Sequence, residues 1–351
     1  MRFSKMGMVF IMITLIFAGL FKHATVQDAD AQERGAKLLI YYGTPKGING
    51  SWDNELAARQ FAMYDYVVWG AGLEEASHEH HLSSKEILKN VRDISPQTQL
   101  FGYVDIGVST HDFSLREMKQ KIRKWRQLGV SGIFLDDAGY DFEVPRERLN
   151  RVVKYVHHLG LPVCVNAWHP SDVFSSDRHD RYNPRGLPSE LGSADYYLLE
   201  NFIQPSGMKG NAAHPLIAEG WLNKLQQVTH YRQATGTKLL SVSMMDYQVY
   251  EESDLDAFFQ IHEVAAAIFS LDGYGVSPMH YSSSAPYYDV VRHASYLSDY
   301  FNYYTVNPEV KTWAPEVPNV QGGHYLEREG FVLRTRLGHY EVAYPPTVKR
   351  E

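Results

Sequence analysis

The sequence has almost no cysteine and no excess of positive charge. Cys164 is the single cysteine among 351 residues, so neither an intramolecular disulfide nor a cysteine-rich metal site can form. We expect this thiol to be a small core residue of a buried strand. Lysine and arginine number 34 against 41 acidic residues, which gives a net charge of −7. Nucleic-acid-binding domains are usually basic, so this class is disfavoured.

Two motifs of common enzyme classes are also missing. No G-x-G-x-x-G fingerprint follows the first apolar strand, which disfavours dinucleotide binding. No G-x-S-x-G turn is present, so an α/β-hydrolase triad is unsupported. We therefore predict that the protein works without a bound cofactor.

Long apolar runs are confined to the N-terminus. Arg2 and Lys5 precede an apolar run over residues 8–21, and residues 29–31 offer an Ala-Asp-Ala cleavage site. The run is shorter than the ~20 residues of a membrane span. We predict a signal peptide over residues 1–31 and a soluble protein that is secreted or periplasmic, with no stable membrane insertion. An uncleaved anchor is the alternative, because the cleavage site lies ten residues beyond the apolar run.

Eight short apolar runs bounded by turn residues follow in the rest of the chain. Their starts lie 28 to 43 residues apart, which leaves room for one helix and its loops each time. They are almost continuously apolar, as in parallel strands covered on both faces. Their ranges are 38–43, 66–70, 99–105, 131–137, 161–168, 195–202, 238–246 and 273–277.

The segments between these runs carry helix signals. Ser114 and Glu117 form a capping box, Gly129 ends that helix, and Pro145 suits the first turn of the next one. Eight strand–helix alternations predict an α/β fold, a (β/α)₈ TIM barrel over residues 36–305. An open doubly wound sheet is the alternative.

The tail has a different pattern. Residues 322–344 contain short β-rich runs separated at Glu329-Gly330 and Leu337-Gly338, which predicts a small antiparallel meander. We assign residues 306–351 to a C-terminal β extension. It could be a structural cap or a carbohydrate-binding element.

Acidic, amide and aromatic residues gather where the predicted strands end. Active sites of TIM barrels lie at the carboxyl ends of the strands. Paired carboxyl groups and aromatic rings are typical of sugar sites. The catalytic candidates are Asp136, Asp137 and Glu200. The candidates for substrate binding are Tyr42, Trp69, Tyr103, Asp105, Asn166, Trp168 and Asp246.

The adjacent acids Asp136 and Asp137 cannot both point into the barrel, because neighbouring residues of a strand face opposite sides. Two close carboxylates raise the pKa of one of them, which suits a general acid. Alternatively, one aspartate caps the following loop. Glu219, beside Trp221, is the main rival to Glu200.

Metal binding is the weaker interpretation of two clusters. The histidine-rich stretch 78–81 lacks a helical ligand spacing and is better explained as a solvated loop than as a zinc site. Asp136, Asp137 and Asp141 could bind a divalent cation in a metal-dependent hydrolase. We predict no metal.

The stretches 101–104 (Phe-Gly-Tyr-Val) and 132–137 (Gly-Ile-Phe-Leu-Asp-Asp), with an amphipathic helix between them, resemble the spherulin-4-type glycosidases. They are also similar to endo-α-1,4-polygalactosaminidases and to the hydrolase domain of Pel exopolysaccharide proteins. The resemblance is clearest over residues 99–202. It implies a TIM barrel that cleaves α-1,4-linked galactosamine or N-acetylgalactosamine polymers by retention, with Asp136 as nucleophile and Glu200 as acid/base. The chain departs from the family pattern at Asp105 and Asp137.

These observations predict a secreted, monomeric glycoside hydrolase acting on an amino-sugar exopolysaccharide, for example in a biofilm. A cationic polymer would be attracted by the acidic protein. The alternatives are a non-catalytic surface or matrix protein that binds polysaccharide, and a metal-dependent exported hydrolase. We expect a polysaccharide partner and no nucleic acid.

Overall fold

The computed structural model describes residues 35–70, 72–209, 216–217, 220–278, 290–293, 296, 324–336 and 339–346. The predicted signal peptide, the rival acid Glu219 and the start of the C-terminal extension lie outside the described residues. None of the helices in the described part of the chain is both long and apolar enough to cross a membrane.

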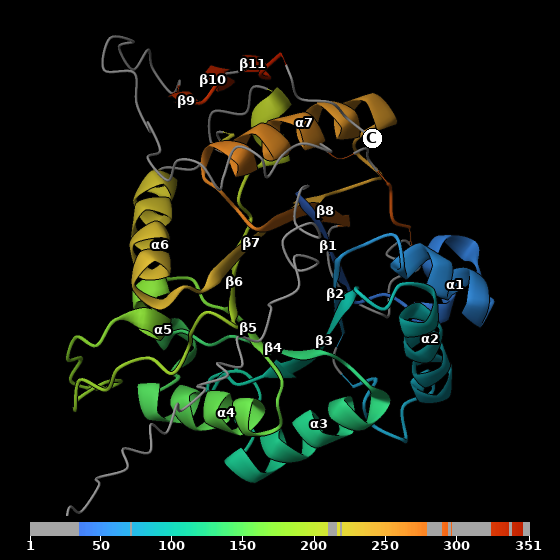
Figure 1. The fold of residues 1–351 in the computed structure, drawn as a ribbon, viewed down its shortest axis with the longest axis vertical. Helices are drawn as coiled ribbons and strands as arrows, with labels where there is room; N and C mark the ends of the chain where they lie inside the picture. The colour runs from blue at the N-terminus through green and yellow to red at the C-terminus, as the bar shows by residue number, and fades with distance from the viewer. Residues whose placement is uncertain are drawn as a thin grey trace, which may run out of the picture. The chain divides into compact units, whose positions relative to one another are not determined.

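Eight parallel strands, hydrogen-bonded in sequence order, close into a barrel with helices around it (Figure 1). The predicted TIM barrel is therefore confirmed. The strands are β1 (Ala36–Tyr41), β2 (Tyr66–Trp69), β3 (Gln99–Asp105), β4 (Gly132–Asp136), β5 (Val163–Asn166), β6 (Tyr196–Glu200), β7 (Lys238–Met245) and β8 (Gly273–Pro278).

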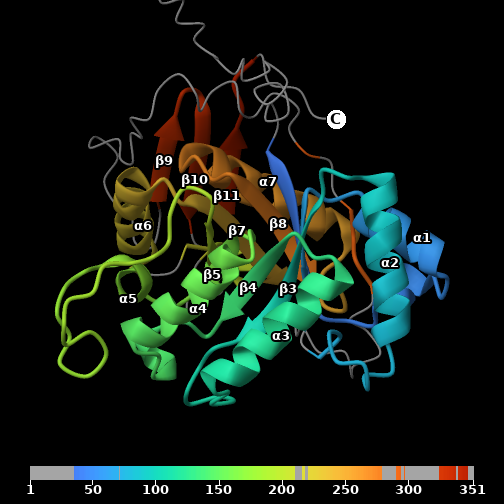
Figure 2. The ribbon, with the colours of Figure 1, turned by 60° about the horizontal axis from the view of Figure 1, so that its bottom comes forward.

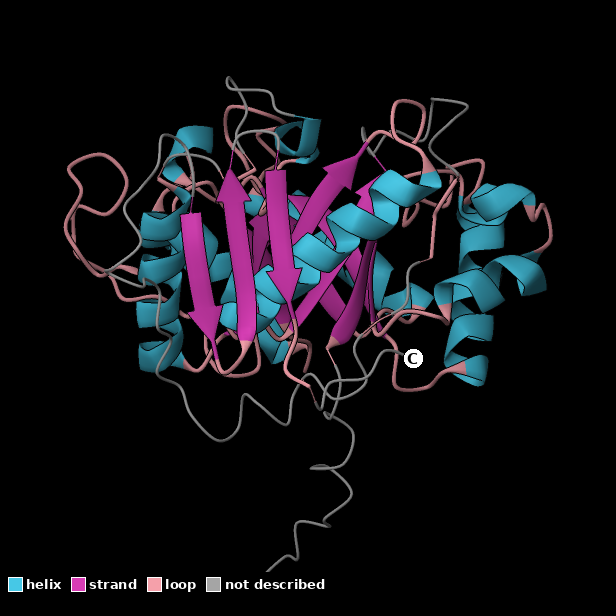
Figure 3. Ribbon diagram, turned by 90° about the horizontal axis from the view of Figure 1, so that it is seen from above, coloured by secondary structure: helices cyan, strands magenta, loops and turns pink. Residues whose placement is uncertain are grey.

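Seven α-helices cover the outside of the barrel in the described part of the chain, and Figure 3 shows several of them flanking the strands. They are α1 (Asn54–Phe61), α2 (His81–Ile94), α3 (Leu115–Leu128), α4 (Arg146–His158), α5 (Pro170–Phe174), α6 (Trp221–Thr235) and α7 (Glu252–Ile268). The 3₁₀ segments are η3 (Pro45–Gly50), η4 (Tyr140–Phe142) and η5 (Pro205–Lys209).

The local signals of α3 work as the sequence predicts. The Ser114 hydroxyl accepts the backbone N–H of Glu117, and the Glu117 carboxylate accepts the N–H of Ser114. Gly129 ends the helix in a left-handed conformation with φ of 91°. This conformation favours glycine because it has no Cβ.

Alternation along the strands separates two apolar cores. One core fills the barrel interior and contains Leu38, Ile40, Tyr66, Val68, Phe101, Phe134, Cys164, Tyr196, Leu198, Leu240 and Val242. The other lies between barrel and helices. Cys164 is fully buried in the interior core, and burial raises the pKa of its thiol, so it is a core residue as expected. Two residues beyond these interior side chains, the same alternation directs Tyr103, Asp136, Asn166 and Glu200 inwards.

The tail forms an antiparallel sheet of β9 (His324–Arg328), β10 (Phe331–Arg336) and β11 (His339–Ala343), with β10 in the middle. The predicted meander is confirmed. The sheet packs against α7, which lies between it and the barrel (Figure 2). The α7 carboxylate of Glu263 accepts hydrogen bonds from Tyr274 of β8 (2.9 Å) and from Tyr344 after β11 (3.0 Å). Both sides of α7 are therefore covered.

The amino ends of the strands are joined by a repeated hydrogen bond. An aspartate stands just before each of β2, β6 and β8. Its side chain accepts a hydrogen bond from a backbone N–H of the preceding strand. Asp65 binds Lys37, Asp195 binds Val163 and Asp272 binds Leu239, at 2.8 to 2.9 Å. Ser131 before β4 accepts the N–H of Leu100 in the same way, at 2.6 Å. At the base of the barrel, short polar side chains thus join the start of β1 to that of β2, β3 to β4, β5 to β6 and β7 to β8.

Candidate active site

Three strand ends bring Asp136, Asn166 and Glu200 together at the carboxyl end of the barrel. The amide nitrogen of Asn166 donates to Asp136 Oδ1 at 3.1 Å and to Glu200 Oε2 at 2.8 Å. One amide therefore holds both carboxyl groups. The Tyr103 hydroxyl also bonds to Asp136, and its ring stands edge-on to Tyr42 at 5.4 Å between centroids. Five of the predicted site residues thus form one group.

Two adjacent carboxyl groups at this end, those of Asp136 and Asp137, have raised pKa values. Burial, with the repulsion of Glu200, raises the pKa of Asp136 to about 6. Burial, with the charges of Asp136 and Asp105, raises the pKa of Asp137 to about 8. Desolvation and like charges both disfavour the ionised form. Near neutral pH Asp136 is mostly ionised, whereas Asp137 keeps its proton.

The backbone is strained beside the same carboxyl groups. Asp137, directly after β4, has φ of 55°, and Asn201, directly after β6, has φ of 52°. Residues other than glycine rarely adopt this conformation, and such strain clusters at functional sites. Asp137 thereby leaves the strand alternation, so both adjacent aspartates reach the mouth of the barrel.

Asp105 is committed to the loop that follows β3. Its side chain is 3% exposed. Oδ1 accepts the N–H of Gly107 at 2.7 Å and the hydroxyl of Thr110 at 2.8 Å, and Oδ2 lies 2.7 Å from Nδ1 of His111. Asp105 therefore orients a histidine that the sequence patterns did not identify.

The remaining predicted binding residues are placed differently. Trp168 is 67% exposed at the mouth, beside the loop that follows β4. Asp246 follows β7, where its carboxylate accepts the N–H of Gln248 within a turn. Trp69 does not lie at the mouth, contrary to our expectation. It is fully buried outside the barrel wall against Phe61 of α1, because the interior positions of β2 are Tyr66 and Val68.

Two further features lie near the carboxyl groups. The rings of Tyr140, His179 and Tyr182 lie with their centroids 5.0 Å apart in each pair, on the loops that follow β4 and α5. Lys224 of α6 lies beside the ring of Trp221, and burial lowers its pKa to about 8 against the attraction of Glu200. These residues lie on loops and on α6 and not at strand ends, so the sequence patterns did not identify them.

No group of three or more histidine, cysteine, aspartate or glutamate residues in the described ranges could hold a metal ion. His78 and His81 instead bond to the backbone of their own loop, at His80 N (3.1 Å) and Leu73 O (2.9 Å). Asp141 points to His169, 3.6 Å away.

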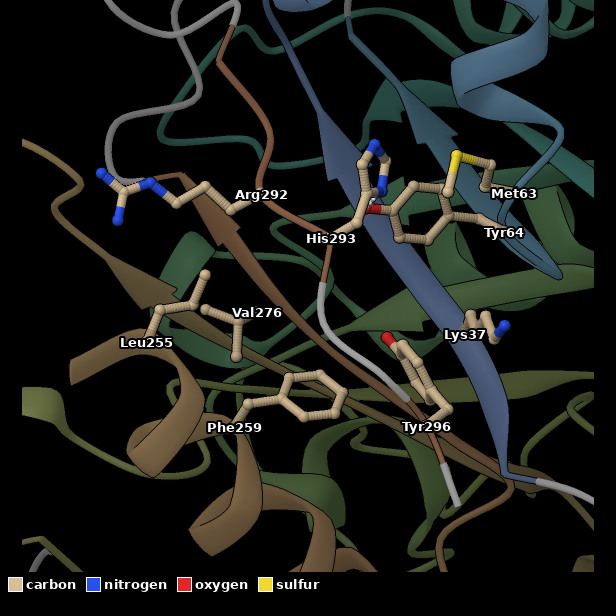
Figure 4. A pocket seen from close by; sticks show the side chains of 9 residues that line it. All are labelled: Lys37, Met63, Tyr64, Leu255, Phe259, Val276, Arg292, His293 and Tyr296. Carbon is tan, nitrogen blue, oxygen red and sulfur yellow. Dashed lines mark hydrogen bonds between the residues drawn. The ribbon is translucent and has the colours of Figure 1, made fainter. Parts of the chain in front are cut away.

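A small cavity of about 40 Å³ lies away from this mouth, outside the barrel wall between β1, β8 and α7. Figure 4 shows its lining, with Tyr64, His293 and Tyr296 around it. This volume has room for a few water molecules. We therefore place the candidate active site at the carboxyl-group cluster.

No protein-family model matches the sequence, and no curated protein matches it. Solved structures with a similar fold include the N-acetylneuraminate lyase of Fusobacterium nucleatum, with 9% identity, a TM-score of 0.35, and 69% of this chain and 70% of that one covered. The HpcH/HpaI aldolase of Desulfitobacterium hafniense DCB-2 is 8% identical with a TM-score of 0.38, and the match covers 72% of this chain and 90% of that one. The malate synthase of Haloferax volcanii is 9% identical with a TM-score of 0.41, and the match covers 70% of each chain.

These findings correct the resemblance to spherulin-4-type glycosidases. No family model supports it, and the structures named above are a lyase, an aldolase and a synthase. The glycoside hydrolase function and its retaining mechanism on a galactosamine polymer are withdrawn with it. At these identities and TM-scores, the likeness assigns no activity to this chain.

Packing accounts for part of the motif that carried the resemblance. A Cβ on Gly102 would lie 2.2 Å from the ring of Trp125, and one on Gly132 would lie 2.4 Å from the ring of Phe101. Both glycines are therefore required by aromatic side chains that lie against the strands. A motif of this kind reports how a barrel is packed, which is compatible with many activities.

Proposed function

We propose that this protein is an enzyme that transfers a proton at a carbon next to a carbonyl group. Asp136 is the general base and Asp137 is the general acid. The observation that carries the proposal is that the φ of 55° at Asp137 brings two adjacent carboxyl groups to the mouth, where burial and like charges raise the pKa of Asp136 to about 6 and that of Asp137 to about 8. Environments that separate the pKa values of neighbouring acids are typical of acid–base catalysis.

The steps follow from these protonation states. Asp136 takes a proton from the carbon, and Asp137 gives its own proton to the carbonyl oxygen, which yields an enol. Asn166 and Tyr103 hold the Asp136 carboxylate through hydrogen bonds. The same Asn166 amide donates to Glu200 at 2.8 Å, which anchors the amide. The anchored amide keeps the base, Asp136, in position while the charge of Asp136 changes.

The charge of the site supports a neutral or amine-bearing substrate. Asp105, Asp136, Asp137 and Glu200 act on one another electrostatically in this region. An anionic substrate would be repelled by these carboxyl groups. The exposed Trp168 would cover one side of a bound molecule.

Proton exchange with solvent tests the proposal without a known product. Residues 32–351 are incubated in heavy water with dihydroxyacetone, glyceraldehyde and galactosamine, and loss of the carbon-bound proton is followed by NMR. We expect exchange on at least one of these compounds, none on pyruvate, and none with Asp136→Asn. Absence of exchange on the whole panel would contradict the proposal.

Export and a monomeric state are further proposals. The basic start and apolar run of residues 1–31 support export. Terminal sequencing of the protein recovered from outside the cell tests the cleavage, and light scattering tests the mass. A polysaccharide as binding partner stays a prediction.

A further inference from the structure

A histidine at the rim of the mouth is bonded to a buried carboxylate. The side chain of His111 is 60% exposed, and that of Asp105 is 3% exposed. Nδ1 of His111 lies 2.7 Å from Oδ2 of Asp105. A carboxylate at this position keeps the proton on Nδ1 and leaves Nε2 as the free base.

The same aspartate reaches the proposed general acid. Burial and the nearby charges of Asp136 and Asp105 raise the pKa of Asp137, so the Asp137 carboxyl group can hold a proton beside Asp105. A Cβ added to Gly107 would lie 3.1 Å from the Asp137 side chain and 3.2 Å from Oδ1 of Asp105. The β3 loop therefore packs directly against Asp137, and His111, Asp105 and Asp137 follow one another from the rim of the mouth to the reacting carboxyl groups.

The loop that carries His111 is held on both sides. Arg148 of α4 donates to the carbonyl oxygens of Ile106 (2.8 Å) and Phe113 (2.6 Å). The His111 ring stacks on Phe113 with centroids 5.1 Å apart. The charged groups around the chain are Asp136 of β4, Asp112 of the same loop, Arg148, and Lys121 of α3 above the Phe113 ring.

Building on the proposed function, we propose that His111, Asp105 and Asp137 form a proton relay between solvent and the reacting carboxyl groups. His111 is the residue that exchanges protons with solvent, and Asp105 is the carboxylate that carries them between His111 and Asp137. The relay would return the proton that Asp137 gives to the substrate oxygen.

Each transfer conserves protons. A proton from solvent binds Nε2 of His111, the Nδ1 proton passes to Asp105, and Asp105 passes one to Asp137. The reverse order delivers a proton from Asp137 to solvent. No other reactant is needed.

The first test needs no substrate. Histidine ¹⁵N and aspartate ¹³C NMR signals are followed from acid to alkaline pH. We expect Nδ1 of neutral His111 to carry the proton, and Asp137→Asn to shift the His111 midpoint by about one pH unit. His157 is the matched control, because its Nε2 lies 2.9 Å from the buried Asp195 at the other end of the barrel. Its midpoint should not move.

The second test uses the exchange assay. His111→Ala should slow exchange about tenfold to hundredfold, and added imidazole should restore it because the site is open to solvent. His157→Ala should show no response to imidazole. A purely structural His111 would lower stability without imidazole rescue.

The outcomes separate the two proposals. Independent titration of His111 and Asp137 overturns the relay, whatever the exchange assay shows. Coupled titration without exchange on any compound overturns the proposed function and supports the relay. Exchange that is indifferent to His111→Ala also overturns the relay.

Discussion

The two ends of the barrel use aspartate in opposite ways. At the base, Asp195 accepts the N–H groups of Val163 and Gly192 and binds His157, at 2.8 to 2.9 Å. At the mouth, burial and the neighbouring carboxyl groups raise the pKa of Asp136. The same residue type therefore fastens strands together at one end and holds exchangeable protons at the other. The difference lies in the partners, since backbone donors stabilise an anion and neighbouring acids destabilise it.

This contrast follows the usual division of labour in TIM barrels. The base supports stability, and the mouth carries the chemistry. The mouth also has strained backbone at Asp137 and Asn201. The crowded carboxyl groups at the mouth thus lower the stability of the fold, and replacing one of them by a neutral residue should stabilise the protein.

The largest expected effect is on catalysis at the mouth. Asp136→Asn removes the base but can keep a hydrogen bond to Asn166 in an altered orientation. We expect the exchange rate to fall by about 10² to 10⁴ with an unchanged or raised melting temperature. Exchange by NMR and thermal unfolding by circular dichroism measure both. Full activity in a folded variant would refute the role of Asp136.

The next effect is on stability at the base. Asp195→Ala leaves the buried N–H of Val163 without its side-chain acceptor, and we expect the free energy of unfolding to fall by about 2–4 kcal/mol. Denaturant unfolding measures it. Asp195→Asn keeps one carbonyl oxygen as an acceptor and should lower the free energy of unfolding by less. Exchange activity per folded molecule should be unchanged, and its selective loss would break the division between the two ends.

A smaller effect concerns the pH dependence of stability. The pKa of Asp137 is raised from 3.8 to about 8 in the folded protein, so the folded state binds this proton more tightly. Stability therefore falls as pH rises from about 4 to about 8. Asp137→Asn should remove this fall and add about 1 kcal/mol at pH ~8, after allowance for partial exposure. At pH ~4 it should add nothing.

Asparagine is the suitable replacement for this test because it tolerates the positive φ of residue 137. Unfolding in urea across this pH range gives the comparison. A stabilisation of equal size at both ends of the range would show that burial and like charges do not act on Asp137.

The smallest expected effect is at an exposed ring of the mouth. Trp168 is 67% exposed, so Trp168→Ala should change the free energy of unfolding by less than about 0.5 kcal/mol. Trp69→Ala empties a buried position and should cost about 3–5 kcal/mol. Denaturant unfolding of both variants tests whether these two tryptophans differ as their burial indicates.

The sequence patterns located the strands well because parallel barrel strands are apolar on both faces. The range predicted for β3, 99–105, is the observed one, and the other ranges differ from the observed strands by one or two residues at one or both ends. Alternation could also have corrected Trp69, since Tyr66 and Val68 occupy the interior positions of β2.

Contacts between distant segments were beyond the sequence patterns. His111 meets Asp105 through a loop conformation, and Tyr140 meets Tyr182 across two loops. Loop paths depend on which backbone groups find partners, and no periodicity encodes them. The resemblance failed for a related reason, because glycines such as Gly102 report the packing of Trp125 and carry no chemistry.

The sequence alone determined the eight-stranded barrel, the C-terminal meander and the strand ends at which polar side chains gather. These follow from local alternation, capping and spacing, which act within a few residues. The tertiary structure decided which carboxyl groups share protons. A pKa depends on charges and burial contributed by different strands, and the pKa values of Asp136 and Asp137 are raised only when the barrel closes.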